Sequence, residues 1–243
     1  MSTSVRPLAL VSGAGVRLGR ACALKLAQSG HDVVVHFNSS QAPAESTAEQ
    51  VRALGAEAFP VQADLSSESG IESLVSYVGS LQRGLRVLVN NASVFYPTST
   101  PQSWVKHWDH FQAVNLKSPF LLTVGLLPLL QECGGNVVNI VDIWARYPLR
   151  RFLPYSVAKA GLEALTKSLA LELAPHVRVN GVSPGAALPP TGLDDSMDKM
   201  LSQVPLQRYG GADSIAEAVE YLSRADYVTG QIIAVDGGRT INL

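Results

Sequence analysis

A tyrosine and a lysine four residues apart, Tyr155 and Lys159, are the pair with the clearest chemical potential. This spacing places both side chains on one face of a helix. A phenol has a pKa of about 10, and a cation a few ångströms away favours the phenolate and lowers that value. Such a pair can deliver a proton, an effect typically worth about 10²–10⁴ in rate. Taken alone, the same spacing is more often just a solvated helix face.

Three further groups of polar residues are expected near that pair. Asp142 follows one apolar segment, the run Asn90–Ser93 follows another, and Asn115 ends a predicted helix. Each could be a simple cap or turn. All of them fall at predicted carboxyl ends of strands or at adjoining helix starts, and that convergence favours an active site.

A glycine-rich segment from Gly13 to Gly19 follows the first apolar segment and opens a helix. Glycines let the backbone approach a pyrophosphate closely, and the helix N-terminus adds unpaired N–H groups. The spacing does not fit the pattern G-x-G-x-x-G, because Leu18 occupies its last position. Such turns are common, but the place of this one after the first strand favours a dinucleotide site.

The second predicted strand ends in polar residues, and no acid appears until Glu45. A site for NAD normally has an acid here to bind the ribose 2′-hydroxyl, whereas a 2′-phosphate requires cations and donors. We therefore expect NADPH, with Arg17 as the cation. The expected donors are His36, Asn38, Ser39 and Ser40. The alternative is a merely polar turn.

The residues that must position these groups form short apolar runs that alternate with helical patterns. Strands are expected at Leu8–Val11, Val33–Phe37, Ala58–Gln62, Val87–Val89, Val137–Val141, Val177–Val182 and Ile232–Val235. Helices are expected at Leu18–Ser29, Ala44–Leu54, Glu68–Leu81, Trp104–Val114, Ser156–Leu173 and Ser214–Arg224. This alternation predicts an α/β fold, a Rossmann-like doubly wound parallel sheet covered on both faces.

No linker is visible, so residues 1–243 are expected to form a single domain that binds the dinucleotide and carries the catalytic residues. The stretch at about 186–207 is rich in proline and glycine and lacks clear periodicity. Long loops of this kind in compact domains are usually functional. We expect this stretch to be a lid over the substrate.

The composition excludes several classes of protein. The hydrophobic content of 47% with only 16% charged residues excludes a disordered chain, and the net charge of −1 argues against a nucleic-acid binder. The longest apolar stretch, residues 120–130, is too short to span a membrane. Two cysteines provide neither a disulfide framework nor a metal site. A cytoplasmic protein without a metal is expected.

Over essentially its whole length the chain resembles the short-chain dehydrogenase/reductases. The motifs that carry this resemblance are the glycine loop with Gly13 and Gly19, Ala63-Asp64-Leu65, Asn90-Asn91-Ala92, Asn115, Tyr155-x-x-x-Lys159, Pro184-Gly185 and Val235-Asp236-Gly237-Gly238.

The resemblance implies four roles in the site. Tyr155 would be the proton donor, and Lys159 would bind the nicotinamide ribose and acidify the phenol. Asn115 would hold a water for a proton relay, and Asp64 would contact the adenine. The implied cofactor contacts are Gly13, Arg17, Leu18, Gly19, His36, Asn38, Ser39, Ser40, Asp64, Leu65, Asn91, Ala92, Ser93, Tyr155, Lys159, Pro184 and Gly185.

The chain departs from the family pattern at the active site itself. Asp142 stands where the family usually has a catalytic serine. A hydroxyl can donate to a ketone oxygen, whereas an ionised carboxylate only accepts. Asp142 would therefore pair well with substrate N–H groups or with the phenol. Phe95 offers a flat apolar face for a heterocycle, with stacking worth about 0.5–1.5 kcal/mol beyond burial.

At these positions the chain resembles the pteridine reductase branch of the family. The implied activity is NADPH-dependent reduction of a dihydropterin or dihydrofolate to the tetrahydro form, with oxidised pterins as further candidates. Tyr155, with Asp142, would protonate the ring nitrogen next to the carbon that receives the hydride. The implied pterin site is lined by Arg17, Ser93, Phe95, Asp142 and Tyr155. That branch usually has a polar residue where this chain has Ala186 and Ala187.

Two alternatives stay open. The first is a carbonyl reductase of the same family that acts on a ketone or 3-oxoacyl substrate, with Asp142 protonated. The second is a non-enzymatic NADP-binding sensor, although the intact Tyr155, Lys159 and Asn115 argue against it. The resemblance also implies a homotetramer that acts on a small molecule, with no nucleic-acid or membrane partner.

Overall fold

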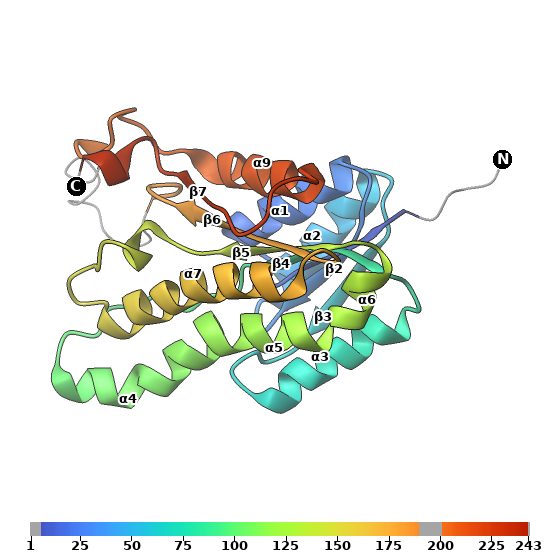
Figure 1. Ribbon diagram of the computed structural model, residues 1–243, viewed down its shortest axis with the longest axis horizontal. Helices are drawn as coiled ribbons and strands as arrows, with labels where there is room; N and C mark the ends of the chain where they lie inside the picture. The colour runs from blue at the N-terminus through green and yellow to red at the C-terminus, as the bar shows by residue number, and fades with distance from the viewer. Residues whose placement is uncertain (1–5, 190–200, 243) are drawn as a thin grey trace.

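The computed structural model describes residues 6–189 and 201–242. Its centre is a parallel sheet that contains every strand expected from the sequence (Figure 1). The strands are β1 (Leu8–Val11), β2 (Asp32–Phe37), β3 (Ala58–Gln62), β4 (Leu85–Asn90), β5 (Asn136–Ile140), β6 (Arg178–Pro184) and β7 (Ile232–Val235). Their order is β3-β2-β1-β4-β5-β6-β7, which is the order of a doubly wound fold.

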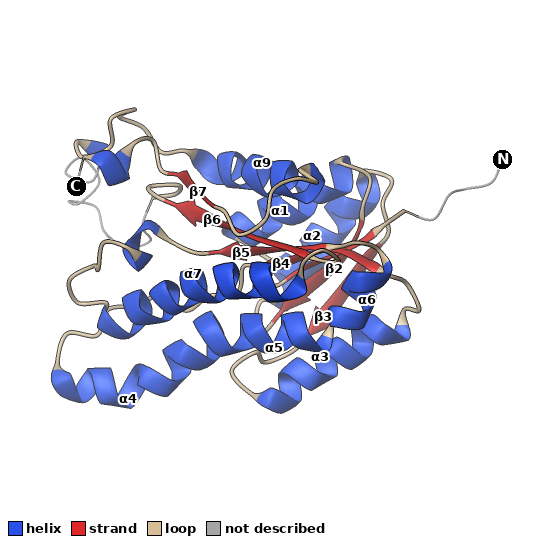
Figure 2. Ribbon diagram, in the orientation of Figure 1, coloured by secondary structure: helices blue, strands red, loops and turns tan. Residues whose placement is uncertain are grey.

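Helices cover both faces of the sheet, so the predicted α/β fold is confirmed (Figure 2). They are α1 (Arg17–Gln28), α2 (Gln41–Ala53), α3 (Glu68–Ser80), α4 (Pro101–Gln112), α5 (Ser118–Gly125), α6 (Leu127–Glu132), α7 (Leu153–Leu173) and α9 (Gly211–Arg224). Helices α1, α2 and α9 pack on one face, and α3, α5, α6 and α7 pack on the other.

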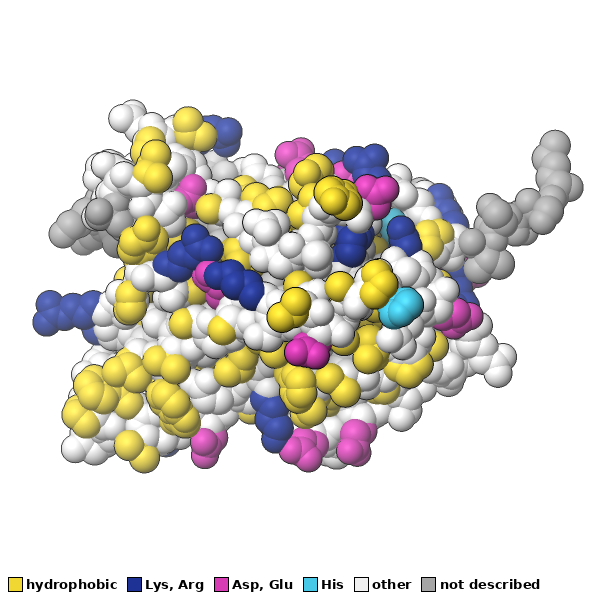
Figure 3. Space-filling model, in the orientation of Figure 1, with side chains coloured by type: hydrophobic (Ala, Val, Ile, Leu, Met, Phe, Trp, Pro, Cys, Tyr) yellow, Lys and Arg dark blue, Asp and Glu magenta, His cyan; other side chains and the backbone are white. Residues whose placement is uncertain are grey.

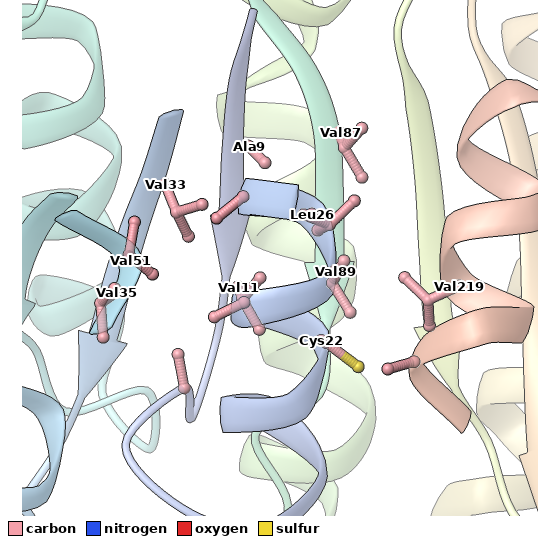
Figure 4. Close-up of a cluster of buried hydrophobic side chains, with 14 of the residues drawn as sticks. Ala9, Val11, Cys22, Leu26, Val33, Val35, Val51, Val87, Val89 and Val219 are labelled. Atoms are coloured by element: carbon pink, nitrogen blue, oxygen red, sulfur yellow. The ribbon is translucent and has the colours of Figure 1, made fainter. Parts of the chain in front are cut away.

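The strands carry few polar side chains because both of their faces are buried. Every residue of β1, β2 and β5 is buried. Figure 4 shows one half of the core, where Val11, Val33 and Val89 of the sheet meet Leu26 of α1 and Val219 of α9. The two apolar layers hold the strand ends rigidly, and those ends carry the site.

The segment after α4 differs from the sequence-based prediction, which placed no helix between residues 115 and 132. A π-helical turn, η1 (Ala113–Lys117), continues α4 directly into α5, and α6 follows. Pro119, Gly125 and Pro128 interrupt the apolar periodicity there and hide the helical pattern.

The expected lid at about 186–207 lies in part outside the described chain, at residues 190–200. The described flanks are tied to the fold: the Gly210 and Gly211 N–H groups donate to the carbonyls of Ala186 and Ala187. Among the described residues, no helix is long and apolar enough to cross a bilayer.

Candidate active site

The glycine loop lies between the carboxyl ends of β1 and β4, where the sheet order reverses. Gly13 has a φ of +66°, a left-handed conformation that favours glycine. A Cβ on Gly19 would stand 2.1 Å from the carbonyl oxygen of Gly13, which no side chain tolerates. The Asn91 amide donates to the carbonyls of Ser12 at 2.8 Å and Gly13 at 3.1 Å. The loop is therefore tight, preshaped and tied to β4.

His36 lies inside the protein rather than at the cofactor surface. Its Nδ1 accepts a 3.1 Å hydrogen bond from the Gly13 N–H, and its Nε2 donates to the carbonyl of Ala63 at 3.0 Å. Burial lowers the pKa of His36 to about 4, so the ring is neutral. The expected role of His36 as a phosphate donor is thus corrected: both ring nitrogens are used, and the residue links the glycine loop to the segment that carries Asp64.

The other residues expected to bind a 2′-phosphate lie at the surface, where a cofactor can reach them. Asn38 and Ser39 are exposed at the end of β2, and Ser40 is partly exposed. Arg17 is exposed at the start of α1, with a φ of 51°. An open cation beside a glycine cradle suits a phosphorylated dinucleotide.

Two further residues of the expected cofactor site follow β3. Asp64 is exposed, and hydrogen bonds from Ser66 lower its pKa, so it is available as a charged acceptor. Leu65 is buried in the core, where it packs rather than faces solvent. Of this pair, only the aspartate presents a polar group to a ligand.

Asn115 lies in the π-helical turn η1 and fastens the loop after β4. Its side-chain oxygen accepts from the Ser93 hydroxyl at 2.6 Å and the Val94 N–H at 3.1 Å, and its amide donates to the Val94 carbonyl at 3.2 Å. The side chain is completely buried. Asn115 thus positions Ser93 and Val94 in the loop after β4, while its implied role in a water relay stays a prediction.

Tyr155 and Asp142 meet as the sequence suggested. The Tyr155 hydroxyl donates to Asp142 Oδ2 at 2.6 Å. The other carboxylate oxygen accepts the Trp144 N–H at 3.0 Å, which caps a short 3₁₀ turn, η2 (Ile143–Ala145). One carboxylate is therefore held between a phenol and a backbone N–H, in a fixed orientation at the end of β5.

Lys159 lies one helical turn below the phenol and is almost completely buried. Its Nζ donates to the carbonyl of Ile140 at 2.7 Å and stands 5.8 Å from the centre of the Tyr155 ring. Burial lowers the pKa of Lys159 to about 8, against the opposing charge of Asp142. The ammonium group is thus anchored to the end of β5.

The electrostatics of Tyr155 differ from the expectation that Lys159 acidifies it. Burial first, and then the charge and hydrogen bond of Asp142, raise the pKa of Tyr155 well above its ordinary value. Burial also raises the pKa of Asp142, against the hydrogen bonds from Trp144 and Tyr155 and the charge of Lys159. The pair therefore retains its proton tightly until a substrate replaces one of the partners.

An aromatic wall stands beside the phenol. Phe95 stacks on Phe152 at 4.5 Å between ring centres and meets Tyr155 edge to face at 4.8 Å. It remains 53% exposed, so one apolar side stays open. Phe152 was not among the residues predicted from the sequence, although an aromatic residue three positions before the tyrosine was a usable signal.

The end of β6 completes the site. The Gly185 N–H donates to the carbonyl of Val235 at 3.1 Å, and a Cβ on Gly185 would stand 2.5 Å from that of Asp236. Pro184, Ala186 and Ala187 are buried. This packing explains why small residues follow the strand, and it leaves the cofactor contacts of Pro184 and Gly185 as predictions.

Comparison with known proteins finds similar chains that are named as oxidoreductases. A family model described as Enoyl-(Acyl carrier protein) reductase matches residues 13–240. The 3-oxoacyl-(acyl-carrier-protein) reductase of Staphylococcus epidermidis is 35% identical over 237 residues, which are 95% of this chain and 97% of the relative. A Synechocystis enzyme of the same name is 32% identical and covers 98% of both chains.

The fold has close structural counterparts as well. The crystal structure of acetoin dehydrogenase from Enterobacter cloacae matches with a TM-score of 0.90 and 33% identity, over 99% of this chain and 98% of that one. None of these names includes a pterin, so they give no support to the pteridine reductase branch. The matches agree on the wider group, and the chain belongs to the short-chain dehydrogenase/reductase family.

Proposed function

We propose that this protein is an NADPH-dependent reductase of a C=N bond in a flat, nitrogen-rich ring, such as a dihydropterin or dihydrofolate. The observation that carries the proposal is the 2.6 Å hydrogen bond from the Tyr155 hydroxyl to Asp142. NADPH, when bound, supplies the hydride. The residues of this chain hold the substrate and move the proton.

The Tyr155–Asp142 pair suits nitrogen better than oxygen as the reacting atom. A carboxylate accepts the N–H groups that a pterin ring presents, but it repels the negative charge that develops on a ketone oxygen. As the ring nitrogen gains electron density, the hydroxyl proton of Tyr155 passes to it. Lys159 then stabilises the phenolate, and solvent restores the proton.

The aromatic wall supports a planar substrate. The open side of Phe95 offers stacking to a ring, and the stacked Phe152 behind it fixes the plane. Aromatic pairs of this kind contribute about 0.5–1.5 kcal/mol beyond the burial of area. A small aliphatic ketone gains less from such a wall.

The choice of NADPH over NADH rests on the exposed residues at the end of β2. Asn38 and Ser39 offer donors there, and Arg17 supplies a positive charge. A 2′-phosphate is stabilised by cations and donors, whereas the ribose 2′-hydroxyl of NADH prefers an acid, and this strand end has none.

A second candidate is reduction of a carbonyl group, for instance a 3-oxoacyl thioester. It is favoured by the names of the relatives, which are 3-oxoacyl reductases, and by the structural match to an acetoin dehydrogenase. Burial raises the pKa of Asp142, and a protonated carboxyl group could donate to a ketone oxygen as a serine does.

A substrate panel separates the two candidates. Purified protein is assayed with dihydrobiopterin, dihydrofolate, acetoin and a 3-oxoacyl thioester, each with NADPH and NADH. The proposal expects turnover of the pterins with NADPH, and an Asp142→Ser variant that loses pterin turnover but gains activity on ketones. Turnover of ketones alone in the wild type supports the second candidate. Tight NADPH binding with no turnover supports a sensor instead.

A homotetramer is the proposed assembly. Large apolar side chains are exposed on the outer helices: Val105 of α4 is 81% exposed and Leu171 of α7 is 79% exposed. Figure 3 shows hydrophobic side chains gathered over the end of α4. Exposed apolar patches of this kind mark contacts between proteins.

A further inference from the structure

Arg239 is a buried cation near the active site that the function described so far does not use. It lies in the 3₁₀ turn η3 (Arg239–Ile241), after β7, and only 7% of its surface is exposed. Arginine is rarely buried to this extent unless it is paired, because an unpaired charge is costly to remove from water. Its burial therefore calls for an explanation.

The chain is built to place this side chain. Gly237 and Gly238 both have left-handed φ values, of 64° and 86°, which reverse the backbone just before Arg239. Asp236 fixes the turn by accepting the Gly238 N–H at 2.9 Å and the Thr240 N–H at 2.8 Å. The turn is thus a rigid support and not a flexible end.

The guanidinium of Arg239 is only partly satisfied. It stacks on Trp144 with 4.9 Å between its central carbon and the ring centre, and Nη2 donates to the neutral amide oxygen of Gln203 at 3.2 Å. Among residues 6–189 and 201–242, its Nε is buried without a hydrogen-bond partner, and so is the hydroxyl of Tyr209, which lies near enough to act electrostatically on Arg239. These two buried donors therefore lie in one neighbourhood, and neither has an acceptor in the described part of the chain.

No carboxylate within residues 6–189 and 201–242 forms an ion pair with Arg239. Asp236 is occupied by its own turn, and Asp142 by Trp144 and Tyr155. Lys159 and Arg239 both oppose the rise that burial causes in the pKa of Asp142, and the charges of Asp142 and Asp236 act in turn on Arg239. Neither of these carboxylates forms a hydrogen bond with the guanidinium, because each is held by other groups.

We propose that Arg239, with Tyr209, binds an oxyanion carried by the substrate, such as a carboxylate attached to the reduced ring or chain. Trp144 connects this subsite to the proposed catalytic pair, since its ring lies against the guanidinium of Arg239 and its N–H donates to Asp142. The subsite selects anionic over neutral substrates of the reductase. This inference rests on the proposed reductase activity but not on the choice between C=N and C=O.

Binding of matched ligands to the NADP⁺-saturated protein tests the proposal. The first pair is 6-carboxypterin and the neutral 6-hydroxymethylpterin, and the second pair is acetoacetate and the neutral acetoin. The proteins are the wild type, Arg239→Met, Arg239→Lys and Tyr209→Phe. The NADP⁺ affinity of each variant shows that it is folded and that the dinucleotide site is intact.

The wild type is expected to bind the anionic member of a pair at least about tenfold more tightly than the neutral one, as hydrogen bonds to a charged group require. Arg239→Met should abolish this preference without weakening the neutral ligand. Arg239→Lys should retain part of it, and Tyr209→Phe should reduce it.

The outcomes separate this inference from the proposed function. If neither pterin binds, C=N reduction of pterins is wrong, and the acetoacetate pair alone decides the role of Arg239. If the wild type prefers no anion in either pair, the subsite is refuted. Equal weakening of both members by Arg239→Met would show a purely structural role and would refute it as well.

Discussion

Replacing His36 with glutamine tests whether a neutral imidazole holds the glycine loop in place. The imidazole is buried, accepts the Gly13 N–H and donates to the Ala63 carbonyl. Burial lowers its pKa from 6.5 to about 4, so protonation must break the folded arrangement. Glutamine offers a donor and an acceptor of similar size but does not titrate.

The difference between 6.5 and about 4 corresponds to roughly 3 kcal/mol, at about 1.36 kcal/mol per pH unit. The folded state resists the proton and the unfolded chain takes it up, so acid favours unfolding. The contribution of His36 is complete above pH 6.5, declines as the pH falls, and is lost below about pH 4. Carboxylates and the buried His31 add acid sensitivity that both proteins share.

The measurement is the free energy of unfolding by urea at several pH values between 8 and 4. Between pH 7 and pH 4 the wild type should lose about 3 kcal/mol more than His36→Gln. At pH 7 the variant should be less stable by about 1–3 kcal/mol, with a raised KM for NADPH, because a flexible amide replaces a rigid ring that bonds Gly13 and Ala63 at the same time. His176→Gln, at an exposed histidine, is the matched control. Equal acid losses in wild type and His36→Gln would refute the argument.

Further predictions address the rest of the site. Gly19→Ala should weaken NADPH binding more than tenfold in a fluorescence titration, because its Cβ would meet the carbonyl of Gly13 at 2.1 Å; normal affinity would contradict this. Phe95→Ala should raise the KM of a pterin about two- to tenfold through lost stacking, with little change for acetoin. The rate should fall as the pH rises through about 8, where Lys159 loses its charge, and a flat alkaline profile would speak against its role. Val105→Glu should shift the sedimentation coefficient toward smaller species, and a wild type that is monomeric at micromolar concentration would refute the tetramer.

The strands were predictable because a doubly covered parallel sheet requires continuous apolar runs, and such runs are visible in the sequence. Helices α5 and α6 were not, because they are apolar on most sides and contain prolines, so they lack the one-sided pattern of a surface helix. The grouping of Tyr155, Asp142 and Asn115 followed from the rule that strand ends share one edge of the sheet.

Side-chain direction and protonation depend on packing and could not be inferred from sequence in the same way. His36 stands at a strand end, yet it is buried and both of its ring nitrogens bond the backbone, at Gly13 and Ala63. The prediction for Tyr155 considered only a nearby cation, whereas burial and an adjacent carboxylate decide the direction of its pKa. Arg239 had no motif to mark it, because its neighbour Trp144 is far away in the chain.

The wide turn η1 has a consequence for how this enzyme can change. A π-helical turn accommodates one more residue than an α-helical turn, and successive residues in an α-helix are rotated by about 100°. Deleting a single residue between 113 and 117 would restore a regular helix from α4 through α5 but swing the Asn115 amide off the Ser93 loop. Such a shortened chain is expected to fold, but Asn115 would no longer hold the loop after β4, which lies beside the dinucleotide site.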